Sequence, residues 1–183
     1  DRVAGGAAMW WLHGALDALS TALAGRDVKL ILRRGAADSI LDTMIAETGA
    51  GAVYWNRCYQ PARIARDSGI KEALKHRGID VKSFNANLLF EPWTIETKAG
   101  GFYKVYTRYW HACRDKGDPS LPLPAPQRLV DASAGVKSDV LSDWQLLPTA
   151  PDWAAGLRAR WQPGEAGAWI RLSAFLHTGL GDY

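Results

Sequence analysis

Cysteine is scarce in this chain, and long apolar runs are missing. Cys58 and Cys113 are far apart and form no C-x-x-C pair, which argues against a disulfide framework or a zinc site and fits a reducing cytoplasm. No apolar run approaches the ~18 to 20 residues that cross a bilayer. Residues 1–9 also lack the basic-then-apolar order of a signal peptide. The sequence therefore predicts a cytoplasmic protein with no membrane span.

Concentrated charge and catalytic spacing are lacking as well. The net charge is only +3, and the densest basic spots, Arg33-Arg34 and the pair Arg158 and Arg160, hold two charges each. A nucleic-acid-binding face needs a more concentrated basic stripe. The sequence contains no Walker A lysine loop, no G-x-S-x-G elbow and no dinucleotide-binding glycine fingerprint after its first expected strand. The four histidines lack metal-ligand spacing: His13, His76, His111 and His177. Spacing alone thus indicates no catalytic residue and no metal ligand.

Hydrophobic periodicity alternates between helix and strand from residue 10 to residue 84. Helices are expected over 9–23, from a cap at Asp38 to Gly49, and over 61–77, and strands over 28–32, 52–55 and 81–84. Gly25, Gly49 and Gly78 are expected to end the three helices. This alternation predicts a parallel α/β sheet with right-handed crossovers.

The pattern changes after Asn85. An apolar loop over 88–93 is followed by a short helix that would place Tyr106, Tyr109, Trp110 and Cys113 on one face. Prolines 119, 122, 124 and 126 then predict an extended connector close to polyproline II. A final helix is expected to carry an apolar stripe: Trp169, Leu172, Leu176 and Leu180.

The strongest local feature is the run Tyr54-Trp55-Asn56-Arg57-Cys58-Tyr59-Gln60-Pro61. Asn56 would follow the carboxyl end of a parallel strand, where open α/β sheets bind ligands. One interpretation is a loop that holds a flat heteroaromatic ring. The structural alternative is a capped strand–helix turn in which Arg66 and Asp67 form an ion pair.

Several segments, in this order, carry a resemblance to a known family. They are Leu32-Arg33-Arg34-Gly35, Val53 to Arg57, Arg66-Asp67, Ser83-Phe84 with Leu88 to Pro92, Gly100-Gly101 with Tyr103 to Trp110, and Pro163-Gly164-Glu165-Ala166-Gly167-Ala168 with the residues to Tyr183. Together these segments resemble the DNA photolyase/cryptochrome family, in its N-terminal antenna domain and interdomain connector. The resemblance covers essentially the whole chain.

The resemblance implies an incomplete Rossmann-like parallel sheet with flanking helices, an irregular Pro-rich connector and a C-terminal helix. Residues 1–115 would form the α/β antenna domain, 116–162 the connector, and 163–183 the start of the helical FAD domain. Family members begin with two further strands, so we expect a fragment of a longer photolyase. A sheet truncated in this way would favour an oligomer or swapped strand pairing.

The family's activity implies a light-dependent cyclobutane pyrimidine dimer photolyase, a carbon–carbon lyase, as the full-length parent. An antenna folate or deazaflavin would pass excitation energy to FAD, and the helical domain would bind damaged DNA. The alternative is a fragment of a cryptochrome-type blue-light photoreceptor. A third hypothesis is a stand-alone nucleotide-binding α/β protein. The 183-residue chain alone is expected to retain no FAD and to repair no dimers.

The antenna site is only partly matched by the family's motifs. Ala62 and Arg63 stand where folate-binding members have an Asn-Glu pair, and the arginine of deazaflavin-binding members is missing from the first helix. The residues implied to line a remaining cofactor site are Asn56, Tyr59, Gln60 and Arg66. No catalytic or metal-binding residue is expected.

Overall fold

The computed structural model describes residues 4–182 and divides the chain into two compact units. One unit comprises Asp1–Thr48 together with Pro126–Tyr183, and the other comprises Gly49–Ala125. The second unit holds the sheet, and each unit is described by itself.

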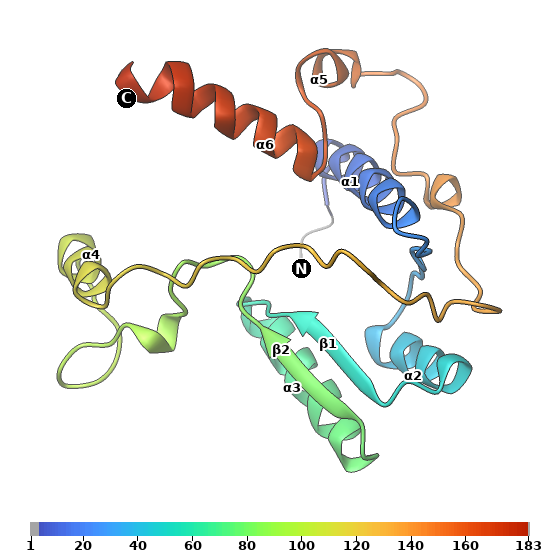
Figure 1. Cartoon of the computed structure of the whole chain (residues 1–183), viewed down its shortest axis with the longest axis horizontal. Coiled ribbons are helices and arrows are strands. Elements are labelled where there is room, and N and C mark those ends of the chain that lie inside the picture. The colour runs from blue at the N-terminus through green and yellow to red at the C-terminus, as the bar shows by residue number, and fades with distance from the viewer. Residues whose placement is uncertain (1–3, 183) are drawn as a thin grey trace. The chain divides into compact units, whose positions relative to one another are not determined.

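The sheet unit contains two parallel strands and one covering helix (Figure 1). Strands β1 (Ala52–Asn56) and β2 (Asp80–Phe84) pair in parallel, and α3 (Pro61–His76) connects them. The register places Val53 beside Val81 and Trp55 beside Ser83. Pro61 suits the first turn of α3 because its fixed φ fits a helix and its missing N–H needs no partner there. These two strands and their parallel order agree with the sequence-based expectation.

The two faces of this sheet differ in burial. Val81 on β2 and Leu74 on α3 are only 4% and 2% exposed, so they form the core between sheet and helix. On the other face, Tyr54 and Phe84 remain about half exposed and contact each other edge to face, with 5.9 Å between ring centroids. Alternation along a strand explains the difference, because successive side chains point to opposite faces.

The rest of the sheet unit is less regular. A helical turn, η1 (Pro92–Thr94), precedes α4 (Tyr106–Asp115), and Lys116 at the end of α4 donates a hydrogen bond from Nζ to the Thr94 carbonyl at 2.6 Å. The expected apolar face of α4 is only partly buried: Cys113 is 1% exposed, whereas Tyr106 is 74% exposed. Residues 117–125 follow without helix or strand, as the prolines predicted.

The other unit is helical. It contains α1 (Gly6–Ala24), α2 (Ala37–Thr48), η2 (Leu141–Trp144), α5 (Ala155–Arg160) and α6 (Glu165–Ala174), which continues through the π-helical turn η3 (Phe175–Gly179) into η4 (Leu180–Asp182). Helices α1 and α2 end before Gly25 and Gly49, as expected. Asp38 was expected to cap α2, but it lies inside its first turn.

Small residues on α1 let residues from 153 to 164 pack closely against this helix. A side chain at Gly6 would contact the Trp153 ring, and a Cβ at Gly14 would lie 2.6 Å from Cγ of Pro163. A Cβ at Gly164 would lie 2.7 Å from the Ala18 methyl group. The segment around Pro163 therefore fits α1 only because these positions lack side chains.

The expected strand over residues 28–32 does not form. The described residues contain a single sheet, made of β1 and β2, and residues 28–32 have no ladder partner in it. The polar backbone atoms of Leu32 bond instead to the connector: its N–H donates to Ser138 Oγ at 2.9 Å, and its carbonyl accepts from the Asp139 N–H at 2.7 Å. A strand-like sequence without a neighbouring strand thus satisfies its backbone elsewhere.

The apolar stripe of the final helix is present but not buried. Trp169, Leu172, Leu176 and Leu180 are between 44% and 60% exposed. The tryptophan buried in the helical unit is Trp10, on α1, at 5% exposure. The stripe of the final helix therefore forms no core within the part of the chain that the structure describes.

Candidate functional site

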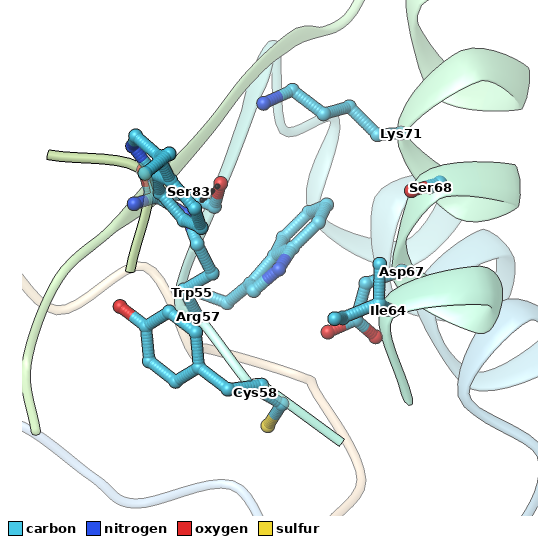
Figure 2. A pocket seen from close by; sticks show the side chains of 10 residues that line it. Trp55, Arg57, Cys58, Ile64, Asp67, Ser68, Lys71 and Ser83 are labelled. Atoms are coloured by element: carbon cyan, nitrogen blue, oxygen red, sulfur yellow. Dashed lines mark hydrogen bonds between the residues drawn. The ribbon is translucent and has the colours of Figure 1, made fainter. Parts of the chain in front are cut away.

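The loops that leave β1 and β2 form a small pocket at the carboxyl end of the sheet. The cavity is about 190 Å³ in volume. Its lining consists of Trp55, Arg57, Cys58, Tyr59, Ile64, Asp67, Ser68, Lys71, Ser83 and Trp93. Figure 2 shows Trp55 projecting from the strand toward α3, which contributes Ile64, Asp67, Ser68 and Lys71. Parallel strands that end at the same edge bring these distant segments together.

Arg57 makes most of the contacts on the side of the pocket that is formed by the ends of β1 and β2. Its guanidinium donates to the Ser83 carbonyl at 2.6 Å and forms an ion pair with Glu91. It also lies over the Trp93 ring, 5.2 Å from the centroid, which is within the range of a cation–π interaction. One cation therefore ties together the ends of both strands and the loop that follows β2.

Tyr59 completes this network. Its hydroxyl donates to Glu91 at 2.8 Å, and its ring lies 6.0 Å from that of Trp93. Burial raises the pKa of Tyr59 above 10.0, and the hydrogen bond to Glu91 raises it further. Burial also raises the pKa of Glu91, but the hydrogen bonds from Tyr59 and Arg57 outweigh it and hold that pKa below 4.5. At neutral pH Glu91 is therefore ionised, and its negative charge offsets the positive charge of Arg57.

The α3 side of the pocket carries a second pair of charges. Arg66 donates from Nε to Asp67 Oδ1 at 2.8 Å, so the expected structural ion pair is present. Asp67 lines the cavity. Arg66 is about half exposed and does not line the cavity itself, but it forms an ion pair with Asp67. Lys71, one turn further along α3, extends its ammonium group away from the helix and across the pocket toward the strands (Figure 2).

The four site residues expected from the sequence do not all meet in this pocket. Tyr59 lines it. Asn56 is the exposed last residue of β1, Gln60 is the exposed residue before α3, and Arg66 reaches the pocket only through Asp67. Sequence reasoning missed Glu91 and Trp93. Their signal was their position after a second parallel strand, which brings them to the same edge as Arg57.

The arrangement is suited to binding rather than to bond chemistry. Trp55, Trp93 and Tyr59 offer aromatic surface, and their polar neighbours could orient a bound ring. The cavity of about 190 Å³ is smaller than the roughly 300 to 1,000 Å³ typical of small-molecule sites, so it fits one flat ring system rather than a whole cofactor. Within residues 4–182, no cluster of three metal-ligating side chains occurs. Over the same residues, no helix is both long and apolar enough to span a membrane.

Comparison with known proteins places this chain and its fold in a family. A family model described as DNA photolyase matches residues 1–127. The chain belongs to the DNA photolyase family. It is 44% identical over 179 residues to a deoxyribodipyrimidine photo-lyase of Agrobacterium fabrum, an alignment that covers 98% of this chain and 37% of that photolyase.

Other members of the family are similar over the same region. Cryptochrome-2 of Arabidopsis thaliana is 36% identical over 186 residues, covering 98% of this chain and 30% of the cryptochrome. The crystal structure of a bacterial class III photolyase from Agrobacterium tumefaciens superposes with a TM-score of 0.90 at 44% identity, over 94% of this chain and 36% of that photolyase. The chain thus spans about a third of the length of these relatives.

Proposed function

We propose that this chain is the antenna and connector portion of a light-driven DNA repair photolyase that splits cyclobutane pyrimidine dimers. The observation that carries the proposal is the 44% identity to a deoxyribodipyrimidine photo-lyase across 98% of the chain. The second candidate is a cryptochrome photoreceptor, supported by the 36% identity to Cryptochrome-2. The higher identity to the photo-lyase favours repair.

The proposed division of labour follows the domain boundaries expected from the sequence. Residues 1–115 form the antenna domain, 116–162 the connector, and 163–183 the beginning of the helical domain. In the full-length protein, FAD supplies the electron that opens the dimer, and the helical domain holds the damaged DNA. Residues of this chain then contribute light harvesting and support, not catalysis.

The proposed antenna site lies at the carboxyl end of β1 and β2. Tyr59 would contact one ring of a folate or deazaflavin in the pocket, beside Trp55 and Trp93, while Asn56, Gln60 and Arg66 would contact its exposed part. The aromatic lining and the small cavity support the binding of a single ring system. The charges of Arg57 and Glu91 compensate each other, so they favour an uncharged ring at this point.

Genetic complementation tests the proposed repair function. Residues 1–183 would replace the matching segment of the Agrobacterium fabrum photo-lyase, and the chimera would be expressed in a photolyase-deficient bacterium. We expect ultraviolet-irradiated cells to recover under blue light but not in the dark. A stable chimera that binds FAD but gives no light-dependent recovery would contradict the proposed repair function and favour the hypothesis of a cryptochrome photoreceptor.

The proposed antenna site is tested in the same chimera. Replacing Tyr59 by Ala should lower the near-ultraviolet absorbance of the antenna chromophore relative to that of FAD. Tyr54→Ala is the matched control, because Tyr54 lies on the opposite, exposed face of the sheet. Equal chromophore content in the two variants would place the antenna elsewhere. The expected oligomer and the cytoplasmic location stay predictions, which light scattering and cell fractionation can check.

A further inference from the structure

The aromatic pocket of the sheet unit holds one cation without a counter-charge. Three of its lining side chains are charged at neutral pH: Arg57, Asp67 and Lys71. Arg57 pairs with Glu91, and Asp67 pairs with Arg66, whose Nη2 lies 2.6 Å from Asp67 Oδ1. Lys71 forms no ion pair or hydrogen bond within the described part of the chain. The pocket therefore carries one uncompensated positive charge.

The ammonium group of Lys71 is directed across this pocket. Lys71 is half-buried, and Figure 2 shows its side chain leaving α3 and extending toward the strands. The same view places Lys71 and Cys58 at opposite ends of the pocket. A lysine that serves only solubility keeps its ammonium group in open water. The direction of Lys71 instead brings a free cation to a ligand that lies in the pocket.

The remaining lining residues determine what else such a ligand must contain. The rings of Trp55 and Trp93 offer flat aromatic surface. Beside them, the charge of Arg57 is already offset by Glu91, so this part of the pocket favours an uncharged ring. A substituent of that ring is then free to approach Lys71. An ammonium group binds an anionic oxygen more strongly than a neutral one, and apolar walls strengthen the attraction by lowering the local dielectric constant.

We propose that this pocket selects flat aromatic molecules that carry a carboxylate, and that Lys71 is the residue that recognises the carboxylate. The ring lies beside Trp55 and Trp93, and its carboxylate accepts hydrogen bonds from the Lys71 ammonium group. Ser68 lines the pocket three residues before Lys71 on α3, so its hydroxyl is on the same side of the helix and donates to the same group. The inference rests on the proposed binding of a ring in this pocket and adds a requirement for negative charge.

Two probes of closely similar shape test this requirement on the 183-residue chain. The first is 2-naphthoate, which carries a carboxylate, and the second is 2-naphthamide, which carries an uncharged amide in its place. Nitrogen–proton NMR at the indole N–H of Trp55, assigned with a Trp55→Phe variant, would follow the binding of each probe. We expect 2-naphthoate to bind about fivefold more tightly, which corresponds to ~1 kcal/mol. Added salt should reduce this preference, because it screens the ion pair.

Three variants connect the preference to Lys71. Lys71→Gln removes the charge but keeps a polar side chain, and it should make the two affinities equal. Lys71→Arg restores the charge and should restore the preference for 2-naphthoate. Lys75→Gln is the matched control, because it removes the same charge one turn further along α3 and outside the pocket lining. It should leave the preference unchanged. Thermal melting would confirm that each variant is folded.

Three results would overturn the inference. They are equal affinity of the parent chain for the two probes, a preference that survives Lys71→Gln, and the failure of both probes to shift the Trp55 signal. Equal binding of both probes would leave the proposed ring site intact and remove only its requirement for charge. The repair function is tested separately, because a chimera that fails to split dimers leaves the selectivity of this pocket unchanged.

Discussion

Gly167 offers a sharp test of how the connector meets the last helix. An alanine Cβ at this position would lie 2.0 Å from the Gln162 carbonyl oxygen and 2.9 Å from its carbonyl carbon. Real Cβ atoms do not approach backbone atoms this closely, so Gly167→Ala requires the backbone to move. The movement is constrained because Pro163 fixes one dihedral angle and Gly164 already adopts a φ of +98°.

The expected loss of stability follows from two opposing effects. Overpacking a constrained site costs up to ~3 kcal/mol. Replacing glycine by alanine in a helix recovers ~1 kcal/mol through helix propensity. We therefore expect Gly167→Ala to lower the free energy of unfolding by ~2 kcal/mol, or Tm by roughly 4 to 8 °C for a chain of this size.

Urea unfolding followed by tryptophan fluorescence measures this change, since Trp161 and Trp169 flank the site. Gly156→Ala is the matched control. Gly156 lies in α5 of the same unit, and an added Cβ there would meet no atom within 4 Å. The control should be as stable as the parent chain or up to ~1 kcal/mol more stable. If Gly167→Ala matched the control, the close contact with Gln162 would be wrong.

Three further predictions concern the two units. The pKa of Glu91 is held below 4.5, so the stability that its carboxylate contributes is present above that pH and is lost as the pH falls below it. Glu91→Gln should therefore flatten the decline in the free energy of unfolding that urea titrations show between about pH 6 and pH 3. Asp139→Ala removes the carboxylate that accepts hydrogen bonds from Trp144 Nε1 and from the Arg34 N–H, each at 3.1 Å. It should cost ~1 kcal/mol and speed hydrogen exchange at the Arg34 amide; unchanged exchange there would contradict this contact. Leu74→Ala should cost ~2 to 5 kcal/mol in thermal unfolding, because Leu74 is 2% exposed, and a loss below ~1 kcal/mol would contradict its place in the core.

Local sequence patterns predicted the elements whose partners follow closely along the chain. Strand β1, helix α3 and strand β2 follow one another directly along the chain, and α3 begins at Pro61 and is followed by Gly78 with its φ of +78°. Their formation therefore depends on nearby residues. Residues 28–32 have an equally good strand pattern, but a strand forms only where another strand lies beside it. The local sequence does not show whether such a neighbour is present. The hydrogen bonds of Leu32 with Ser138 and Asp139 join positions more than 100 residues apart.

The position of the pocket in the sheet unit was predictable from the sequence, but its lining was not. The rule that ligands bind at the carboxyl ends of parallel strands pointed to the loop after β1, and Tyr59, which the family resemblance implied, lines the pocket there. It did not show that Asn56 and Gln60 would be exposed, because side-chain direction at a loop depends on the turn that the backbone makes. Glu91 and Trp93 were missed because their contacts with Arg57 bridge more than 30 residues.

The most direct measurement is the rate at which the purified chimera, carrying residues 1–183 in the Agrobacterium fabrum photo-lyase, splits pyrimidine dimers in a short DNA strand. If this chain is the antenna portion of a repair photolyase, dimers will disappear under blue light and persist in darkness. Loading with the antenna chromophore will raise the rate at near-ultraviolet wavelengths. A folded chimera that holds FAD and leaves the dimers intact under light would contradict the proposal.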